Sequence, residues 1–320
     1  MNSSLLHNFL TFKQGYNRGL GKAPHKPILM LAVIEAIERD VINDNIIPIS
    51  PELVSLFKSY WDSIVITNHI ANFSLPFFHL KNEKRSNIWQ LIEKPGFKDI
   101  ITSSKSVKSF KALTDAVYFA KLNSEFYNYL LDKENREIAK EQILNRYFNL
   151  SNYELTTNYF DKYESEMIND NPELYKAKIR KKIIEAKEEY VEESYIRLEI
   201  FKKNIPLIYS NTCAITGLHI TSNNNISMID ACHIVPFAEA HDCTVGNGIA
   251  LCPNMHRAFD RGLLSINENY RVIIANNFHE KDSSYSISQF DKKQILLPSE
   301  KRFYPRQENL DVHRKQFGFS

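Results

Sequence analysis

The pattern of apolar and polar positions divides the chain into three stretches, and the first covers residues 1–150. Apolar residues at helical spacing predict helices there, and short apolar runs bounded by polar turns predict strands. The predicted helices are 5–12, 28–37, 53–61, 113–120 and 125–148, and the predicted strands are 46–49, 77–80 and 88–92. This stretch is therefore expected to be a mainly helical domain with a small β-hairpin or sheet.

The second stretch, residues 151–204, is polar and then helical. No strong periodicity is present up to 170, whereas Asn171, Pro172 and Glu173 predict the start of a helix that runs to about Lys203. Intermixed lysine and glutamate residues are typical of a solvent-exposed helix. The plain interpretation is a connector helix ending at Pro206, and a dimerisation helix is the alternative.

The third stretch, residues 205–320, alternates short apolar runs with turns. A strand is predicted over 228–235, a tight turn over 246–248 and a helix from Pro253 onward, with a further strand over 270–275. The whole chain is therefore expected to be α+β, with an N-terminal domain, a helical connector and a C-terminal domain.

Composition adds little to this division, because 40 basic and 38 acidic side chains nearly cancel. A nucleic-acid partner would need local basic clusters, and balance neither supports nor excludes it. Neither a signal peptide nor an apolar run long enough to span a bilayer is recognisable, so we expect a cytoplasmic protein without a membrane partner.

Basic residues gather around the start of the predicted helix 28–37. Arg18 and Lys22 lie in a glycine-rich turn, and His25 and Lys26 directly precede the helix. The free amides and positive dipole end of a helix N-terminus favour phosphate, which makes these four side chains candidate DNA contacts. The alternative is that Pro27 simply starts a core helix. Lys84 and Arg85, in the predicted hairpin loop, are either further backbone contacts or a solvated turn.

The third stretch carries the candidate catalytic residues. His233 lies on the predicted strand 228–235, Asn247 lies in the tight turn, and His256 lies on the helix that follows. Hydrolysis of a phosphodiester needs a base that is neutral near pH 7, which histidine can be, and positive charge beside the phosphorus, which a divalent ion can supply. His233 is the candidate base, and His256 and Asp230 are candidate ligands of the ion. Asn247 is either a ligand or a group that orients His233.

The four cysteines, at 213, 232, 243 and 252, include no C-x-x-C pair. Small buried thiols are the expected outcome, and a structural zinc site is not expected because the spacing is wrong for a zinc knuckle. Thr216 also stands where a second zinc-binding cysteine would be placed.

The segments ACHIVP, NGIALC and HRAFD, which surround His233, Asn247 and His256, resemble the HNH nucleases of the ββα-metal class over about Cys213 to Phe317. The resemblance implies that His233 is the general base, Asn247 the middle asparagine and His256 a metal ligand, with one Mg²⁺ or Mn²⁺ ion. Many members place an aspartate or histidine directly before the base, where this chain has Cys232. Asp230 is expected to replace that ligand; Cys232 as a ligand would favour a softer metal.

Residues 10–150 resemble the DNA sulfur-binding domain of restriction endonucleases that act on phosphorothioate-modified DNA. The resemblance rests on short blocks: APHKPILML at 23–31, Tyr60 with Trp61, LPFFHL at 75–80, IWQL at 88–91 and NRYF at 145–148. It implies that Pro76 lines an apolar pocket for sulfur, with Phe77 beside it, and that His25 and Lys26 approach the DNA. Leu75 stands where the family commonly has tyrosine, which leaves another DNA mark open.

The two resemblances together predict a modification-dependent restriction endonuclease that recognises marked double-stranded DNA through residues 1–150 and cuts it through residues 205–320. The alternatives are an HNH nuclease for an unmodified sequence or another modification, and a catalytically silent DNA-binding protein. Because cutting both strands with a single-ion module needs two copies, a homodimer is expected.

Overall fold

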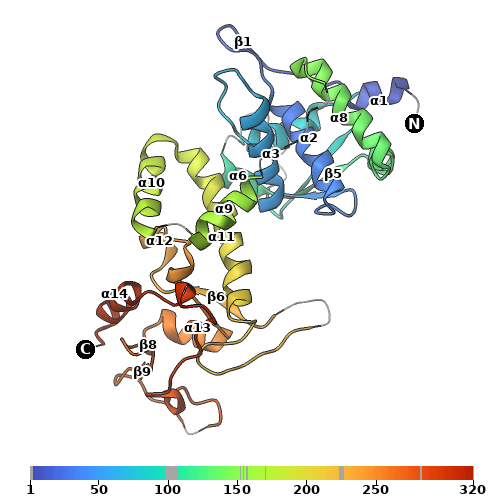
Figure 1. The fold of residues 1–320 in the computed structure, drawn as a ribbon. Helices are drawn as coiled ribbons and strands as arrows, with labels where there is room; N and C mark the ends of the chain where they lie inside the picture. Colours follow the sequence, from blue (N-terminus) through green and yellow to red (C-terminus); the bar gives the residue numbers. More distant parts are fainter. Residues whose placement is uncertain are drawn as a thin grey trace. The chain divides into compact units, whose positions relative to one another are not determined.

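The computed structural model describes residues 3–97, 107, 109–151, 153, 155, 158–169, 171–222, 227–281 and 283–319. The chain forms two compact units, of which unit 1 comprises Met1–Lys162 with Glu185–Ile196, and unit 2 comprises Tyr163–Ile184 with Arg197–Ser320. Helices and several small sheets make up both units, so the α+β prediction is confirmed (Figure 1). Within the described ranges, every helix is too short or too polar to cross a membrane.

Unit 1 is built around the buried helix α2 (His25–Glu38). Eleven consecutive residues of α2, Pro27–Ile37, are buried, as the almost unbroken apolar run predicts. It packs against α3 (Pro51–Ile64), α4 (Ser74–His79) and α8 (Lys133–Phe148). Ser50 caps α3 through a hydrogen bond from the Leu53 amide to its Oγ, at 3.2 Å, which confirms the predicted helix start.

A three-stranded antiparallel sheet completes unit 1, in the order β3, β5, β4. Strand β3 is Ile46–Pro48, β4 is Trp89–Glu93 and β5 is Val117–Leu122. The remaining elements are α1 (Ser3–Phe9), the two-residue strands β1 (Tyr16–Asn17) and β2 (Gly21–Lys22), α6 (Phe110–Ala116), α7 (Ser124–Leu130) and the 3₁₀ turn η1 (Leu80–Asn82).

Three predicted elements of this unit are wrong. Residues 77–80, predicted as a strand, lie in α4 and η1, so the hairpin loop predicted around Lys84 does not exist. The predicted helix 113–120 stops at Ala116, where β5 begins. The helix predicted over 125–148 is two helices, because Asp132 accepts a hydrogen bond from the Asn135 amide, 3.0 Å away, and caps α8.

The predicted connector is also more broken than expected. It holds α9 (Tyr159–Asn169), α10 (Pro172–Glu185) and α11 (Lys187–Ile208). Asn171 does start α10, since its Oδ1 accepts from the Glu173 amide at 2.9 Å. Pro206, however, lies inside α11. The helix ends at Ile208, shortly before Ser210 and Asn211, whose positive φ angles of 52° and 54° turn the chain away.

Unit 2 contains two small antiparallel sheets, each of two strands. Strand β6 (Asp230–His233) pairs with β7 (Gly248–Leu251), and β8 (Leu264–Ile266) pairs with β9 (Val272–Ile274). The helices are α12 (Phe237–Ala240), α13 (Pro253–Asp260) and α14 (Gln307–Phe317), with 3₁₀ turns η2 (Val245–Asn247), η3 (Ser288–Phe290) and η4 (Lys301–Phe303).

Candidate active site

Strands β6 and β7 and helix α13 position the predicted catalytic residues. The register of the two strands places His233 opposite Gly248. Cys252 is the N-cap of α13, and Pro253 opens the helix at a position where its missing N–H leaves no donor unpaired. The predicted strand, turn and helix therefore exist, and they form one β-β-α arrangement.

His233 lies in an aromatic, largely apolar setting. Its ring stacks on that of Phe201 of α11, with centroids 3.8 Å apart and planes 9° apart. Its Nε2 lies 3.8 Å from the Cys243 thiol. Burial, together with the positive charges that His256 and Lys202 can carry, lowers the pKa of His233 to about 4. The imidazole is consequently neutral at neutral pH, which is the state a general base requires.

The α11 helix reaches this site only because residue 248 is glycine. A Cβ at Gly248 would lie 2.4 Å from Ile205 Cδ1 and 3.0 Å from Phe201 Cζ. Real Cβ atoms do not approach other atoms so closely. The glycine therefore lets the helix carrying Phe201 pack directly against β7.

Asn247 is fully buried and its amide is engaged on both sides. The side-chain oxygen accepts from the Val235 amide at 2.9 Å, and the side-chain nitrogen donates to the carbonyls of Val235 and Asp242, both at 3.0 Å. These bonds tie together the segment that follows His233. The arrangement corresponds to the positioning alternative for Asn247, whereas the metal-ligand alternative would need an amide oxygen facing a cation site.

His256 lies between two carboxylates. Its Nδ1 is 3.3 Å from Asp230 Oδ2, and its Nε2 is 3.4 Å from Asp260 Oδ2. Asp230 comes from β6, whereas Asp260 lies on α13 one helical turn after His256. The structure thus brings the predicted ligands Asp230 and His256 together and adds a second acidic side chain.

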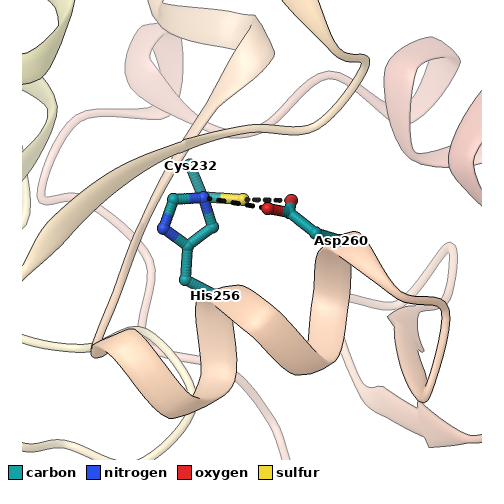
Figure 2. Close-up of side chains that lie close together, drawn as sticks. All are labelled: Cys232, His256 and Asp260. Atoms are coloured by element: carbon teal, nitrogen blue, oxygen red, sulfur yellow. Dashed lines mark hydrogen bonds and ion pairs between the residues drawn. The ribbon is translucent and has the colours of Figure 1, made fainter.

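Cys232 completes a group of possible metal donors with His256 and Asp260, whose ligand atoms all lie within 4.8 Å of one another. Figure 2 shows the thiol and the carboxylate converging on one edge of the imidazole. The Cys232 Sγ is 3.7 Å from Asp260 Oδ1, and burial and the negative charge of Asp260 raise the pKa of the thiol well above its usual value. Sulfur, nitrogen and oxygen at this separation fit a divalent ion.

A cavity of about 410 Å³ joins the base to this group. His233, His256 and Asp260 lie in its wall, and Phe237 and Phe317 contribute apolar surface. A group that takes up a proton and a group that can hold a cation therefore face one space. That combination can activate water and neutralise developing negative charge on a phosphate.

Two residues of the site were not predicted. Asp260 is not among the predicted ligands, although its spacing of four from His256 places both on one helix face. Phe201 lies 32 positions before His233 and carries no motif, so the sequence holds no signal for its stacking.

The other three cysteines are buried, as is Cys232, in agreement with the prediction of small buried thiols. Cys213 Sγ accepts from the Thr216 amide at 3.4 Å, and Thr216 Oγ1 lies 3.9 Å from Cys252 Sγ. A hydrogen bond from Cys252 is the main cause that lowers the pKa of Cys213 to about 5. The turn that starts the module is thus held by hydrogen bonds among sulfur, hydroxyl and backbone groups.

Three of the eight predicted DNA contacts of unit 1, His25, Lys26 and Pro76, line a second cavity, of about 420 Å³. Leu75 and Pro76 form apolar wall, and His25, Lys26 and His79 also line it. Burial lowers the pKa of His25, whose Nε2 donates to the Ile70 carbonyl, 3.0 Å away. Pro76, which the sequence resemblance places in the wall of an apolar pocket, is one of the residues that line this cavity.

Two of the predicted DNA contacts have partners within unit 1. Phe77 is fully buried against Trp89, and its carbonyl accepts from the Trp89 indole at 2.9 Å, so it belongs to the core. The Lys26 ammonium pairs with buried Glu83 at 2.5 Å, and Glu83 also accepts from the Lys13 amide at 2.9 Å. Lys26 therefore stabilises the cavity wall.

The remaining predicted contacts are exposed. Arg18 and Lys22 lie in and next to the turn between β1 and β2, and Lys84 and Arg85 lie in the turn after η1. Exposure leaves these four side chains available to a phosphate backbone, and it is equally typical of a solvated turn.

Comparison with known proteins identifies the C-terminal site. A family profile described as HNH endonuclease matches residues 213–267. No curated protein matches the chain. A solved structure of the modification-dependent restriction endonuclease TagI aligns with 23% identity over 36% of each chain, with a TM-score of 0.28. A structure of the type IV phosphorothioation-dependent restriction endonuclease ScoMcrA aligns with 10% identity over 79% of this chain and 93% of that chain, with a TM-score of 0.31.

The matched segment contains β6, β7 and α13 with His233, Asn247 and His256, in the arrangement described above. Residues 213–267 of this chain are an HNH endonuclease domain.

Proposed function

We propose that this protein is a modification-dependent restriction endonuclease. Unit 1 binds marked double-stranded DNA, with phosphorothioate as the mark we favour, and the HNH domain hydrolyses its phosphodiester bonds with a divalent ion. The observation that carries the proposal is the cavity in which His233 faces His256 and Asp260. A protein that only binds DNA has no chemical need for a neutral base beside a set of metal donors.

The residues of the cavity divide the chemistry between them. His233 takes the proton of the attacking water, because its lowered pKa keeps it neutral when the substrate arrives. Asn247 holds the segment after His233, and Phe201 fixes the plane of its ring. A divalent ion bound beside His256 would supply positive charge to the phosphate and to the departing oxygen.

The cavity of unit 1 supports the recognition half of the proposal. Sulfur in place of a non-bridging phosphate oxygen is larger and less well hydrated, so the apolar wall of Leu75 and Pro76 favours it over oxygen. Lys22 and Arg18 lie exposed on the neighbouring turn and can pair with adjacent phosphates. Leu75 supplies apolar surface without the hydroxyl of a tyrosine.

Plasmid cleavage tests both halves. The full-length protein is incubated with phosphorothioate-containing and unmodified plasmid of the same sequence, with and without divalent ions. We expect cleavage of the modified plasmid alone, lost in His233→Ala and retained in His279→Ala, whose histidine is exposed and lies outside the cavity.

Each contrary outcome has a defined meaning. Equal cutting of both plasmids would replace the proposal by a nuclease for an unmodified sequence. Tight binding without cutting under any ion would replace it by a silent binding protein. Undiminished cutting by His233→Ala would remove His233 as the base.

We also propose that two copies act together when both strands are cut, because one HNH domain holds a single set of catalytic residues. Cleavage rate should then rise more steeply than in proportion to protein concentration.

A further inference from the structure

The donor group in the active site contains a sulfur atom, which is unusual for a centre that acts on phosphate oxygens. Cys232 Sγ comes from β6, and a nitrogen of His256 and an oxygen of Asp260 come from α13. All three atoms lie within 4.8 Å of one another (Figure 2). Bonds of 2.0–2.3 Å from a central ion to nitrogen, oxygen and sulfur would span such a group.

The hydrogen bonds of His256 determine which of its nitrogens is available. Asp230 Oδ2 lies 3.3 Å from Nδ1 and accepts its proton, which leaves the lone pair on Nε2. Asp260 lies on the Nε2 side, 3.4 Å away. A carboxylate that holds the far side of a ligating histidine fixes its tautomer and increases its basicity. Asp230 therefore orients His256, and Asp260 is the carboxylate placed to bind the ion.

The Cys232 thiol lies beside the Asp260 carboxylate, so a bound cation can take the place of the thiol proton. It is fully buried, and its thiol donates to Asp260 Oδ1 at 3.7 Å. A divalent ion placed between these groups replaces the shared proton, which leaves to solvent as the metal–sulfur bond forms. The ion, in place of water, then stabilises the negative charge of the buried thiolate.

We propose that Cys232, His256 and Asp260 ligate the ion of this nuclease and that the thiolate makes the site select borderline ions such as Co²⁺ or Zn²⁺ over Mg²⁺. Softer donors raise affinity for these ions, whereas Mg²⁺ prefers oxygen ligands and retains its waters. This inference rests on the proposed metal-dependent nuclease and replaces Asp230 and Asn247 as ligands.

Cobalt titration of the full-length, metal-free protein tests the inference. Thiolate ligation produces a sulfur-to-cobalt charge-transfer absorption in the near ultraviolet, and we expect it in the wild type. Cys232→Ser should lose the band, and Cys213→Ser, which removes another buried thiol, should retain it. Circular dichroism checks that each variant is folded, and Cys232→Asp replaces Cys232→Ser if the serine variant is not.

Calorimetric affinities for Co²⁺, Zn²⁺ and Mg²⁺ add a second readout. Cys232→Asp should reverse the preference toward Mg²⁺. Asp230→Ala should weaken binding by about 10–100-fold, as loss of an orienting carboxylate does, and Asp260→Ala should weaken it further.

Three results would overturn the inference: cobalt binding without the band in the wild type, a band that persists in Cys232→Ser, or binding lost more completely in Asp230→Ala than in Asp260→Ala. These readouts do not involve DNA. A protein that binds Co²⁺ through Cys232 but cuts no plasmid would refute the proposed function and leave the ligand assignment intact.

Discussion

Substitution of Asn247 separates a positioning role from a metal-binding role. In Asn247→Ala the carbonyls of Val235 and Asp242 lose a donor, and the buried Val235 amide loses its acceptor. Three lost hydrogen bonds of roughly 1 kcal/mol each, plus an unpaired buried donor, predict a loss of on the order of 3–5 kcal/mol in the free energy of unfolding of unit 2. Ion affinity in the folded protein should change little.

Asn247→Asp makes the contrast sharper. The carboxylate can still accept from Val235, but it places a second oxygen against two carbonyl oxygens, so destabilisation should persist. A metal-ligand role predicts the opposite, because a carboxylate binds divalent ions more strongly than an amide does.

Urea denaturation of full-length wild type and both variants measures the stability, and calorimetric titration with Co²⁺ measures the affinity. Wild-type stability in Asn247→Asp combined with tighter ion binding would refute the positioning role.

Three further predictions concern packing, pH and the cavity of unit 1. Gly248→Ala should lower the free energy of unfolding of unit 2 by about 1–3 kcal/mol through overpacking. Adding Ile205→Val, which removes the Cδ1 atom 2.4 Å from the new Cβ, should restore part of that free energy in urea denaturation. Wild-type stability of Gly248→Ala alone would contradict the close approach. Burial lowers the pKa of His313 to about 4, so on acidification the unfolded chain protonates this imidazole first, and the free energy of unfolding falls by up to about 3 kcal/mol between about pH 6.5 and 4. Urea midpoints measured at several pH values should fall less in His313→Gln than in the wild type. An equal fall would exclude the histidine as the cause. Glu83→Gln should lower the melting temperature of unit 1, because the Lys26 ammonium loses its buried partner. An unchanged melting temperature would contradict a stabilising role for this ion pair.

Local sequence signals predicted the elements whose structure is decided locally. The run 28–37 is apolar on all sides and long enough for a helix, which predicts a buried helix. Ser50 followed by Pro51 is a helix-start signal that acts within the segment itself. The order of His233, Asn247 and His256 predicted the HNH domain for a similar reason, since the three lie on consecutive elements of one β-β-α arrangement.

Elements that depend on distant packing were not predictable in this way. Residues 77–80 are apolar and buried whether helical or extended, so their periodicity could not distinguish the two. Residues 117–122 form a strand because β3 and β4 pair with that segment on either side, which no local pattern reveals. The pairing of Lys26 with Glu83 and the stack of Phe201 on His233 likewise join residues far apart in the sequence.

The contact between Phe201 and His233 sets a lower limit on the size of a fragment that keeps the candidate active site intact. The family match begins at Cys213, but the ring that covers the base and the Ile205 side chain that lies against Gly248 both belong to α11. A fragment cut at the family boundary would expose one face of His233 to water and raise its proton affinity toward that of a free histidine. A minimal fragment that tests the proposed nuclease should therefore begin before Phe201, because the pKa of its candidate base depends on residues outside the family match.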